Sequence, residues 1–294
     1  MHGIHSESKN VLTAIIPITK MAGRLHNLEL CISECTNLPI SLILIHDIQD
    51  NGTSSELKKI LLDNKDLDIK LIEGKYGSPG LARNVGLKES LAPWAIFWDS
   101  DDLPKPQVVI DALKKAGTKP QMIIGNFSTN SSNGVREIRH SGKLSNVAMN
   151  PGLWRFIIRS DILSDVKFCS TRMGEDQIFL LDLIPESRTI LFSDEIFYEY
   201  FLGNPLQLTS VQRDIDEVED ALILVKNRLG EDMKLRTNFS RFILTKLFFT
   251  TISRTKRQSR PQIFIRHFSV LLNTNPTIVF KLLINFTFQQ GLQK

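Results

Sequence analysis

The sequence contains few cysteines and no long apolar run, and these two shortages exclude several classes of protein. Three cysteines among 294 residues cannot complete a disulfide framework, so we expect reduced thiols. No apolar run reaches the roughly 18–20 residues that a membrane-spanning helix requires. The amino end, MHGIHSESKN, is polar and lacks the apolar core of a secretory signal. We therefore expect a cytoplasmic protein, either soluble or lying peripherally on the cytoplasmic face of a membrane.

Histidine is also scarce, and no Ser-His-Asp order is present among the six histidines. His46 ends an apolar stretch and is a candidate pocket residue, whereas His140 lies in a polar segment and is expected to be solvated. Cys31 and Cys35 are four residues apart on an expected helix. We expect them to pack as reduced thiols, because two further ligands for a metal are not evident nearby.

Acidic residues are missing from the carboxyl-terminal segment. Met233–Lys294 contains 11 Lys or Arg and no Asp or Glu, whereas Met1–Asp232 carries a net charge of −7. Apolar stretches at Phe242–Ile252 and Phe264–Leu272 flank a basic patch at Arg254–Arg260. This segment is expected either to contact an anionic membrane surface, or to dock on the body of the protein or on a protein partner. Nucleic acid is not expected, because no nucleic-acid-binding motif accompanies the charge.

Apolar, β-branched runs alternate with amphipathic stretches along the first two thirds of the chain. Strands are expected at Val11–Pro17, Ile40–His46, Leu67–Glu73, Ala95–Trp98, Gln121–Phe127, Leu153–Arg159 and Glu195–Phe201. Helices are expected at Leu25–Glu34, at Ser54–Asp63 with Ser54 or Ser55 as its cap, at Leu81–Ser90, after Gly174 and from about Asp214 onward. The alternation predicts an α/β fold with a mostly parallel sheet covered by helices on both faces.

Polar groups follow several of the expected strands. Pro17–Lys20, Asp47 and Asp99–Asp102 come directly after the first, second and fourth strands. Ligands of such sheets bind beyond the carboxyl ends of the strands, so we expect these groups to converge on one crevice.

Each candidate motif has a structural alternative. Three carboxylates within Asp99–Asp102 suit Mg²⁺ or Mn²⁺, but the segment can equally be a solvated acidic turn before a helix. Gly77–Gly80, followed by Arg83, suits an anion site or only a tight turn. It is not a Rossmann dinucleotide fingerprint, because it follows the third strand. Glu175 and Asp176 suit general-base chemistry or simple capping of the next helix.

Taken together, these segments resemble the inverting GT-A glycosyltransferases of family 2 over roughly residues 11–201. Ala14–Thr19 resembles the first strand of the family, and Asp47–Thr53 resembles its acidic turn. Gly80–Leu87 is similar to the Ala-Arg-Asn-x-Gly-Leu segment, and Asp99-Ser100-Asp101 to the DxD motif. Gly174-Glu175-Asp176, with Trp154 before it, resembles the acceptor half.

The resemblance implies a Rossmann-like GT-A domain over residues 1–205, with a nucleotide-sugar half at about 11–104 and an acceptor half at about 105–205. Residues 206–294 would form a basic helical extension. The residues expected to contact the nucleotide sugar are Pro17, Thr19, Asp47, Gly80, Arg83, Asp99, Ser100 and Asp101. Asp101 is expected to be the main ligand of Mn²⁺ or Mg²⁺, Asp176 the catalytic base, and Trp154 and Glu175 residues of the acceptor side.

The function so implied is transfer of a sugar, with inversion and metal assistance, from a UDP-linked donor to a hydroxyl of a glycan or lipid-linked acceptor. One alternative is a catalytically silent GT-A-like subunit that binds a sugar nucleotide or glycan in a polysaccharide-assembly complex. It is suggested by His46, which replaces the first Asp of the family's turn, and by Ile48-Gln49, which replaces Gly-Ser. Another is a nucleotidyltransferase, which would normally place a glycine-rich loop where Pro17–Lys20 stands.

Overall fold

Buried β-branched runs form the four strands with which the chain begins its sheet. The computed structural model describes residues 10–48, 51–171, 173–186, 189–202, 215–231, 237–255 and 259–272. The first strands are β1 (Leu12–Ile18), β2 (Ile40–Asp47), β3 (Ile69–Gly74) and β4 (Trp94–Phe97). They lie in the order β3-β2-β1-β4 and all their pairings are parallel. The four strands expected in this part of the sequence are confirmed, with ends shifted by one or two residues.

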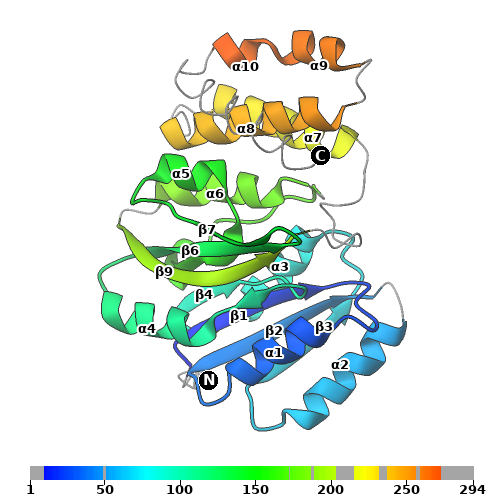
Figure 1. Cartoon of the computed structure of the whole chain (residues 1–294), viewed down its shortest axis with the longest axis vertical. Helices are drawn as coiled ribbons and strands as arrows, with labels where there is room; N and C mark the ends of the chain where they lie inside the picture. The colour runs from blue at the N-terminus through cyan, green and yellow to red at the C-terminus, as the bar shows by residue number, and fades with distance from the viewer. Residues whose placement is uncertain are drawn as a thin grey trace, which may run out of the picture. The chain divides into compact units, whose positions relative to one another are not determined.

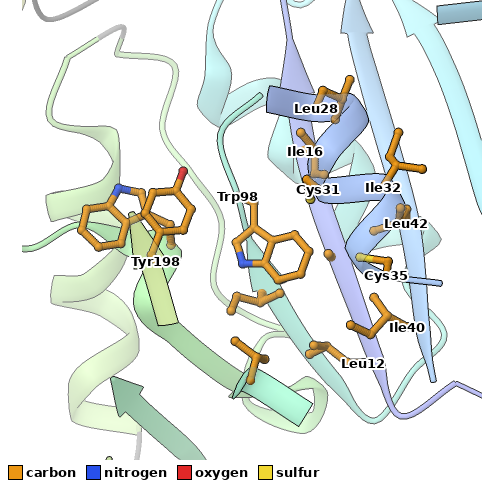
Figure 2. Close-up of a cluster of buried hydrophobic side chains, with 14 of the residues drawn as sticks. Leu12, Ile16, Leu28, Cys31, Ile32, Cys35, Ile40, Leu42, Trp98 and Tyr198 are labelled. Carbon is orange, nitrogen blue, oxygen red and sulfur yellow. The ribbon is translucent and has the colours of Figure 1, made fainter. Parts of the chain in front are cut away.

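Helices cover both faces of this parallel half, as expected (Figure 1). They are α1 (His26–Glu34), α2 (Asn51–Asp63), α3 (Pro79–Glu89) and α4 (Pro106–Ala116). Alternate residues of β1, such as Ile16, pack with α1, α2 and α4 in one buried cluster. Figure 2 shows Cys31 of α1 and Cys35, which directly follows this helix, within the cluster, so their expected packing role is confirmed. On the opposite face, a Cβ at Gly86 would lie 2.4 Å from Ile15 Cγ2, so α3 rests directly on β1.

The second half of the sheet mixes strand directions. It contains β5 (Leu103–Pro104), β6 (Met122–Ser131), β7 (Gly134–Ile138), β8 (Phe156–Arg159) and β9 (Ile190–Phe201). The order continues from β4 as β8-β6-β9-β5, with β7 paired to β6 as the second strand of a hairpin. β8 runs antiparallel to both of its neighbours, whereas β9 runs parallel to β6. The architecture is the expected GT-A-like α/β fold.

The chain divides into two compact units. Unit 1 comprises Met1–His140, Gly152–Phe168 and Glu186–Asn204, and unit 2 comprises Ser141–Pro151, Cys169–Pro185 and Pro205–Lys294. Unit 1 contains the sheet, α1 to α4 and the short helices η1 (Leu153–Arg155) and η2 (Ser160–Ile162). Unit 2 contains α5 (Leu144–Met149), α6 (Glu175–Glu186), α7 (Ile215–Glu231), α8 (Asn238–Arg254), α9 (Arg260–His267) and α10 (Ser269–Leu272). The expected division near residue 205 cuts the chain differently and stays a prediction.

The segment after β2 differs from its expected form. α2 begins at Asn51, so the Asn-Gly pair lies in a helix rather than in a turn. Ser54 and Ser55 therefore lie inside α2 instead of capping it. Ser54 Oγ instead lies 3.3 Å from His46 Nδ1, which places this serine against the end of β2.

The expectation that His140 is solvated is wrong. Its side chain is buried, because the ring packs 5.0 Å from the ring centre of Phe192 and Nε2 lies 2.8 Å from Ser193 O. Its backbone N–H donates to Asn126 Oδ1. Burial lowers the pKa of His140, so the neutral ring is favoured.

Parts of the expected basic segment lie outside the described residues, namely 233–236 at its start, 256–258 in the basic patch and 273–294 at the carboxyl end, as do residues 1–9 at the amino end. Within the described ranges, no helix has both the length and the apolar content needed to cross a membrane.

Candidate active site

The acidic turn at Asp99–Asp102 lies where the carboxyl end of β4 leaves the parallel half of the sheet. Pairing with β1 continues one residue beyond β4, because the Trp98 N–H donates to Ile15 O over 3.1 Å. Asn27 of α1 donates its side-chain amide to the Asp101 carbonyl oxygen over 2.7 Å. These bonds fix the turn at the edge of the sheet where ligands of α/β proteins bind.

Asp102, the last residue of the turn, binds β9. Its side chain is 1% exposed, Oδ2 accepts the Tyr198 hydroxyl over 3.0 Å, and Oδ1 accepts the Phe201 N–H over 2.8 Å. Burial, with the nearby charges of Asp101 and Asp99, raises the pKa of Asp102 well above its usual value. The third carboxylate of the turn therefore attaches the turn to the sheet.

Arg83 reaches the same turn from α3. Ser78 caps this helix by accepting a backbone N–H of the first turn, which fixes where the helix begins. The buried Arg83 guanidinium donates through Nη2 to Asp99 Oδ1 over 2.8 Å and lies over the Phe168 ring, 5.5 Å from its centre. The Asp99 side chain remains 30% exposed. A buried cation thus orients a carboxylate that solvent and ligands can still reach.

Asp47 ends β2 and binds the loop before α3. Its Oδ1 accepts the Tyr76 N–H over 2.9 Å and its Oδ2 accepts the Gly77 N–H over 3.0 Å. The residue is 9% exposed. A continuous path of contacts therefore leads from Asp47 through this loop into α3, and from Arg83 of α3 to the acidic turn. The expected hydrogen bond from Asp47 to a nucleotide base stays a prediction.

The other residues predicted for the nucleotide sugar belong to elements that meet at this edge. Pro17 lies near the end of β1, and Thr19 follows the strand directly. Gly80 is buried in the first turn of α3, and Ser100 is buried within the acidic turn. Unit 1 therefore contains every residue predicted for the donor side.

The acidic turn suits a divalent cation that shares its ligands with a substrate. Among the described residues, no group of three or more His, Cys, Asp and Glu side chains is arranged to hold a metal by itself. Mg²⁺ commonly binds through one or two carboxylates plus substrate phosphates, and Mn²⁺ prefers the same oxygen ligands. Asp99 is paired with Arg83 and Asp102 binds β9, whereas Asp101 is half-buried between them. The carboxylates of the acidic turn therefore suit Mn²⁺ or Mg²⁺ that also binds substrate oxygens, and Asp101 as the main metal ligand stays a prediction.

The residues predicted for the acceptor side fall in both units. Trp154 lies in η1 of unit 1, where its ring stacks on Tyr198 with centres 4.4 Å apart and planes 6° apart. Glu175 and Asp176 form the first turn of α6 in unit 2, Glu175 buried and Asp176 half-buried. Acidic residues in a first helical turn also complement the helix dipole. Their roles in acceptor binding and catalysis stay predictions.

Sequence reasoning missed two residues that fix the acidic turn. Tyr198 belongs to the expected aromatic strand, and its spacing of two from Tyr200 places both on the face that meets Trp154, so a signal was present. Asn27 lies on α1, far from the turn in sequence, and no local pattern marks it.

Comparison with known proteins places these observations in a family. The glycosyl transferase family 2 model matches residues 13–180. S. aureus TarS 1–349 in complex with UDP-GlcNAc is similar with a TM-score of 0.70 and 18% identity, over 91% of this chain and 82% of that chain. The mannosyltransferase PcManGT from Pyrobaculum calidifontis, in complex with GDP-Man and Mn²⁺, is similar with a TM-score of 0.58 and 10% identity, over 97% and 88%. Comparison with curated proteins finds no match.

At these identities the solved structures establish a shared fold. The family model goes further, because its match spans β2 to β8, the Arg83 helix, the acidic turn and the Glu175-Asp176 pair, and covers more than half of the chain. The chain therefore belongs to glycosyl transferase family 2 and is a glycosyltransferase.

Proposed function

We propose that this glycosyltransferase moves a sugar from a UDP-linked donor to a hydroxyl of a glycan or lipid-linked acceptor, by a single displacement with inversion. The observation that carries the proposal is the path of contacts from Asp47 through α3 to the Arg83–Asp99 pair. This path links Asp47, a carboxylate suited to hydrogen-bond a nucleotide base, with Arg83 and Asp99, which are charged groups suited to contact the sugar diphosphate. The two similar structures, which contain UDP-GlcNAc and GDP-Man with Mn²⁺, support a nucleotide-sugar donor.

On the donor side, the acidic turn and Arg83 orient the sugar diphosphate. Arg83 keeps Asp99 in one position through their 2.8 Å contact, and Asp101 is the proposed ligand of the cation. When bound, Mn²⁺ or Mg²⁺ supplies positive charge that stabilises the departing diphosphate.

On the acceptor side, Asp176 is the proposed general base. The acceptor oxygen forms a bond to the anomeric carbon while the bond from that carbon to the diphosphate oxygen breaks. The nucleoside diphosphate leaves with the bonding electron pair, and the acceptor proton passes to the Asp176 carboxylate. Attack opposite the leaving group inverts the anomeric configuration, and no covalent enzyme intermediate forms.

The first test is a panel of UDP- and GDP-sugars with and without Mn²⁺. Binding should raise the melting temperature by mass action, and the best donor should then release nucleoside diphosphate in a Mn²⁺-dependent manner. Proton NMR of the transfer product should show an inverted anomeric centre. Binding without release, for every donor and with glycan acceptors present, would favour the silent-subunit alternative instead.

The base assignment is tested by Asp176→Asn. This variant should lose transfer at least about 10³-fold, within the range of general-base effects, and keep nearly normal donor binding. Asp220→Asn is the matched control, because Asp220 is an exposed aspartate of α7 in the same unit. Turnover retained in Asp176→Asn would remove Asp176 from the role of base.

We propose further that unit 2 contacts an anionic membrane surface through α9. Phe264 and Ile265 of this short helix are 38% and 74% exposed, and Phe268, which directly follows the helix, is 44% exposed. The described ranges 237–255 and 259–272 contain basic residues and no acidic one, and Arg266 of α9 pairs with Glu219 of α7. Apolar side chains beside basic ones are typical of helices that lie in an anionic lipid interface.

Flotation of the full chain with vesicles containing phosphatidylglycerol tests this contact. Ile265→Ser should weaken binding several-fold, whereas Leu91→Ser should not, because Leu91 is equally exposed (73%) but lies in unit 1. Vesicles of phosphatidylcholine alone should bind weakly. Equal flotation of Ile265→Ser and the unsubstituted protein would contradict the assignment of α9, and concentration-dependent dimers lost in Ile265→Ser would indicate a second copy as the occupant.

A further inference from the structure

One tyrosine hydroxyl connects the two ends of the acidic turn. Tyr198 Oη accepts the backbone N–H of Asp99 over 3.1 Å and donates to Asp102 Oδ2 over 3.0 Å. Tyr198 is fully buried. The hydroxyl therefore spans the turn across Ser100 and Asp101, and contacts the backbone at one end and the side chain at the other.

Asp102 completes this arrangement by attaching the turn to β9. Its other oxygen accepts the Phe201 N–H over 2.8 Å, three residues beyond Tyr198 on the same strand. Both oxygens of this nearly fully buried carboxylate are thus engaged with β9. Asp102 is therefore placed to support the turn rather than to bind the donor.

Aromatic packing fixes the ring that carries the hydroxyl. Trp154 stacks on Tyr198 with a 4.4 Å separation of ring centres, and Phe127 packs edge-on against Trp154, also at 4.4 Å. The Tyr198 ring thus has little freedom to rotate its hydroxyl away from the turn. Trp154 is expected from sequence on the acceptor side. Its ring stacks on Tyr198, which in turn bonds the acidic turn.

We propose that Tyr198 and Asp102 are positioning residues, which fix the backbone of the acidic turn so that Asp101 presents its carboxylate to the cation and diphosphate. The inference rests on the proposed function, because it takes Asp101 as the metal ligand. Without the Tyr198 hydroxyl, the Asp99 N–H and the buried Asp102 carboxylate lose a shared partner, and the turn can adopt other conformations.

The experiment measures binding of UDP to Tyr198→Phe by calorimetry, with and without Mn²⁺. We expect the Mn²⁺-dependent affinity to fall about tenfold, the scale of one buried hydrogen bond, while UDP affinity without Mn²⁺ stays within about twofold. Electron paramagnetic resonance of free Mn²⁺ should show the same loss of metal binding. Tyr200→Phe is the control, because Tyr200 lies on the same strand and also stacks on Trp154.

The outcomes separate this inference from the function on which it rests. If the UDP affinity of the unsubstituted protein is the same with and without Mn²⁺, the proposed metal site is wrong and this inference fails with it. If Mn²⁺ strengthens UDP binding equally in the unsubstituted protein and in Tyr198→Phe, the inference alone is overturned. Should Tyr198→Phe fail to fold, Asp102→Asn provides the second test, since the amide has one acceptor oxygen where the carboxylate uses two, one for the Tyr198 hydroxyl and one for the Phe201 N–H.

Discussion

Aspartates stand at the carboxyl ends of both β2 and β4, at the same edge of the sheet, but their carboxylates are used differently. Asp47, the last residue of β2, accepts two backbone N–H groups of the loop before α3, one with each oxygen. The turn after β4 divides the work, because Asp99 pairs with Arg83, Asp102 binds β9, and Asp101 lies half-buried between them. The comparison teaches that the turn after β4 separates structural from accessible carboxylates, because Asp102 attaches the turn to β9 while the Asp99 side chain remains 30% exposed beside Arg83.

The largest expected effect is on catalysis, from Asp101→Ala. Loss of the proposed metal ligand removes several kcal/mol of charge stabilisation at the leaving group, so transfer should fall about 10³-fold or more. Asp111→Ala, at a site 60% exposed on α4, is the matched control, and comparable activity in the two variants would remove Asp101 from the site.

The second effect is on stability, from Asp47→Ala. Two amides lose a charged acceptor, so the free energy of unfolding should fall by about 2–4 kcal/mol, measured by urea denaturation. Asp47→Asn should lose less, since an amide oxygen still accepts one bond. If Asp47→Ala were no less stable than Asp101→Ala, the structural role assigned to the Asp47 carboxylate at the end of β2 would be wrong.

A smaller effect is expected from Arg83→Lys, which keeps the charge but changes its geometry. The guanidinium bonds Asp99 and lies over Phe168, and a lysine ammonium cannot reproduce both contacts. Donor affinity should fall about tenfold in a titration with UDP and Mn²⁺. Lys88→Arg, an exposed change on the same helix, should leave affinity unaltered, and an unaltered Arg83→Lys would show that charge alone suffices.

The smallest effect concerns pH and the end of β2. A hydrogen bond from His46 is the main cause that lowers the pKa of Glu73, with further help from Ser54. A lowered carboxyl pKa stabilises the fold above its unfolded value, about 4.3, and this stabilisation is lost as the pH falls through the folded value. Glu73→Gln should therefore cost no more than about 1 kcal/mol at pH 7, and less at pH 3.5. A cost independent of pH would contradict this account.

Much of the fold could be predicted because it depends on local pattern. Runs such as Ile40–His46 are apolar and rich in β-branched residues, which indicates a buried strand, and the helix expected from Leu81 is present, although it begins at Pro79 because Ser78 caps it. The segment around Asn51 misled because Asn-Gly usually turns, whereas here it opens α2. His140 misled because its neighbours in sequence are polar, while the strand that covers it is distant.

The candidate site also contains some residues that local sequence predicts and others that it does not. Arg83 and Asp99 could be predicted from their motifs and from the edge at which parallel strands end, and their contact is observed. The partners that decide which aspartate supports the turn, Tyr198 and Asn27, come from segments far away in sequence. Such contacts depend on how strands and helices are brought together, which residue spacing within one segment does not encode.

The tryptophans give unit 1 a spectroscopic signature of its own. All three, Trp94, Trp98 and Trp154, belong to unit 1, and unit 2 contains none. Trp98 directly precedes the acidic turn and Trp154 stacks on Tyr198, and both are buried. Intrinsic tryptophan fluorescence therefore reports unfolding of the sheet and of the acidic turn, whereas circular dichroism also reports unfolding of the helices of unit 2. Melting curves recorded by the two signals will reveal whether the two units unfold together or in succession.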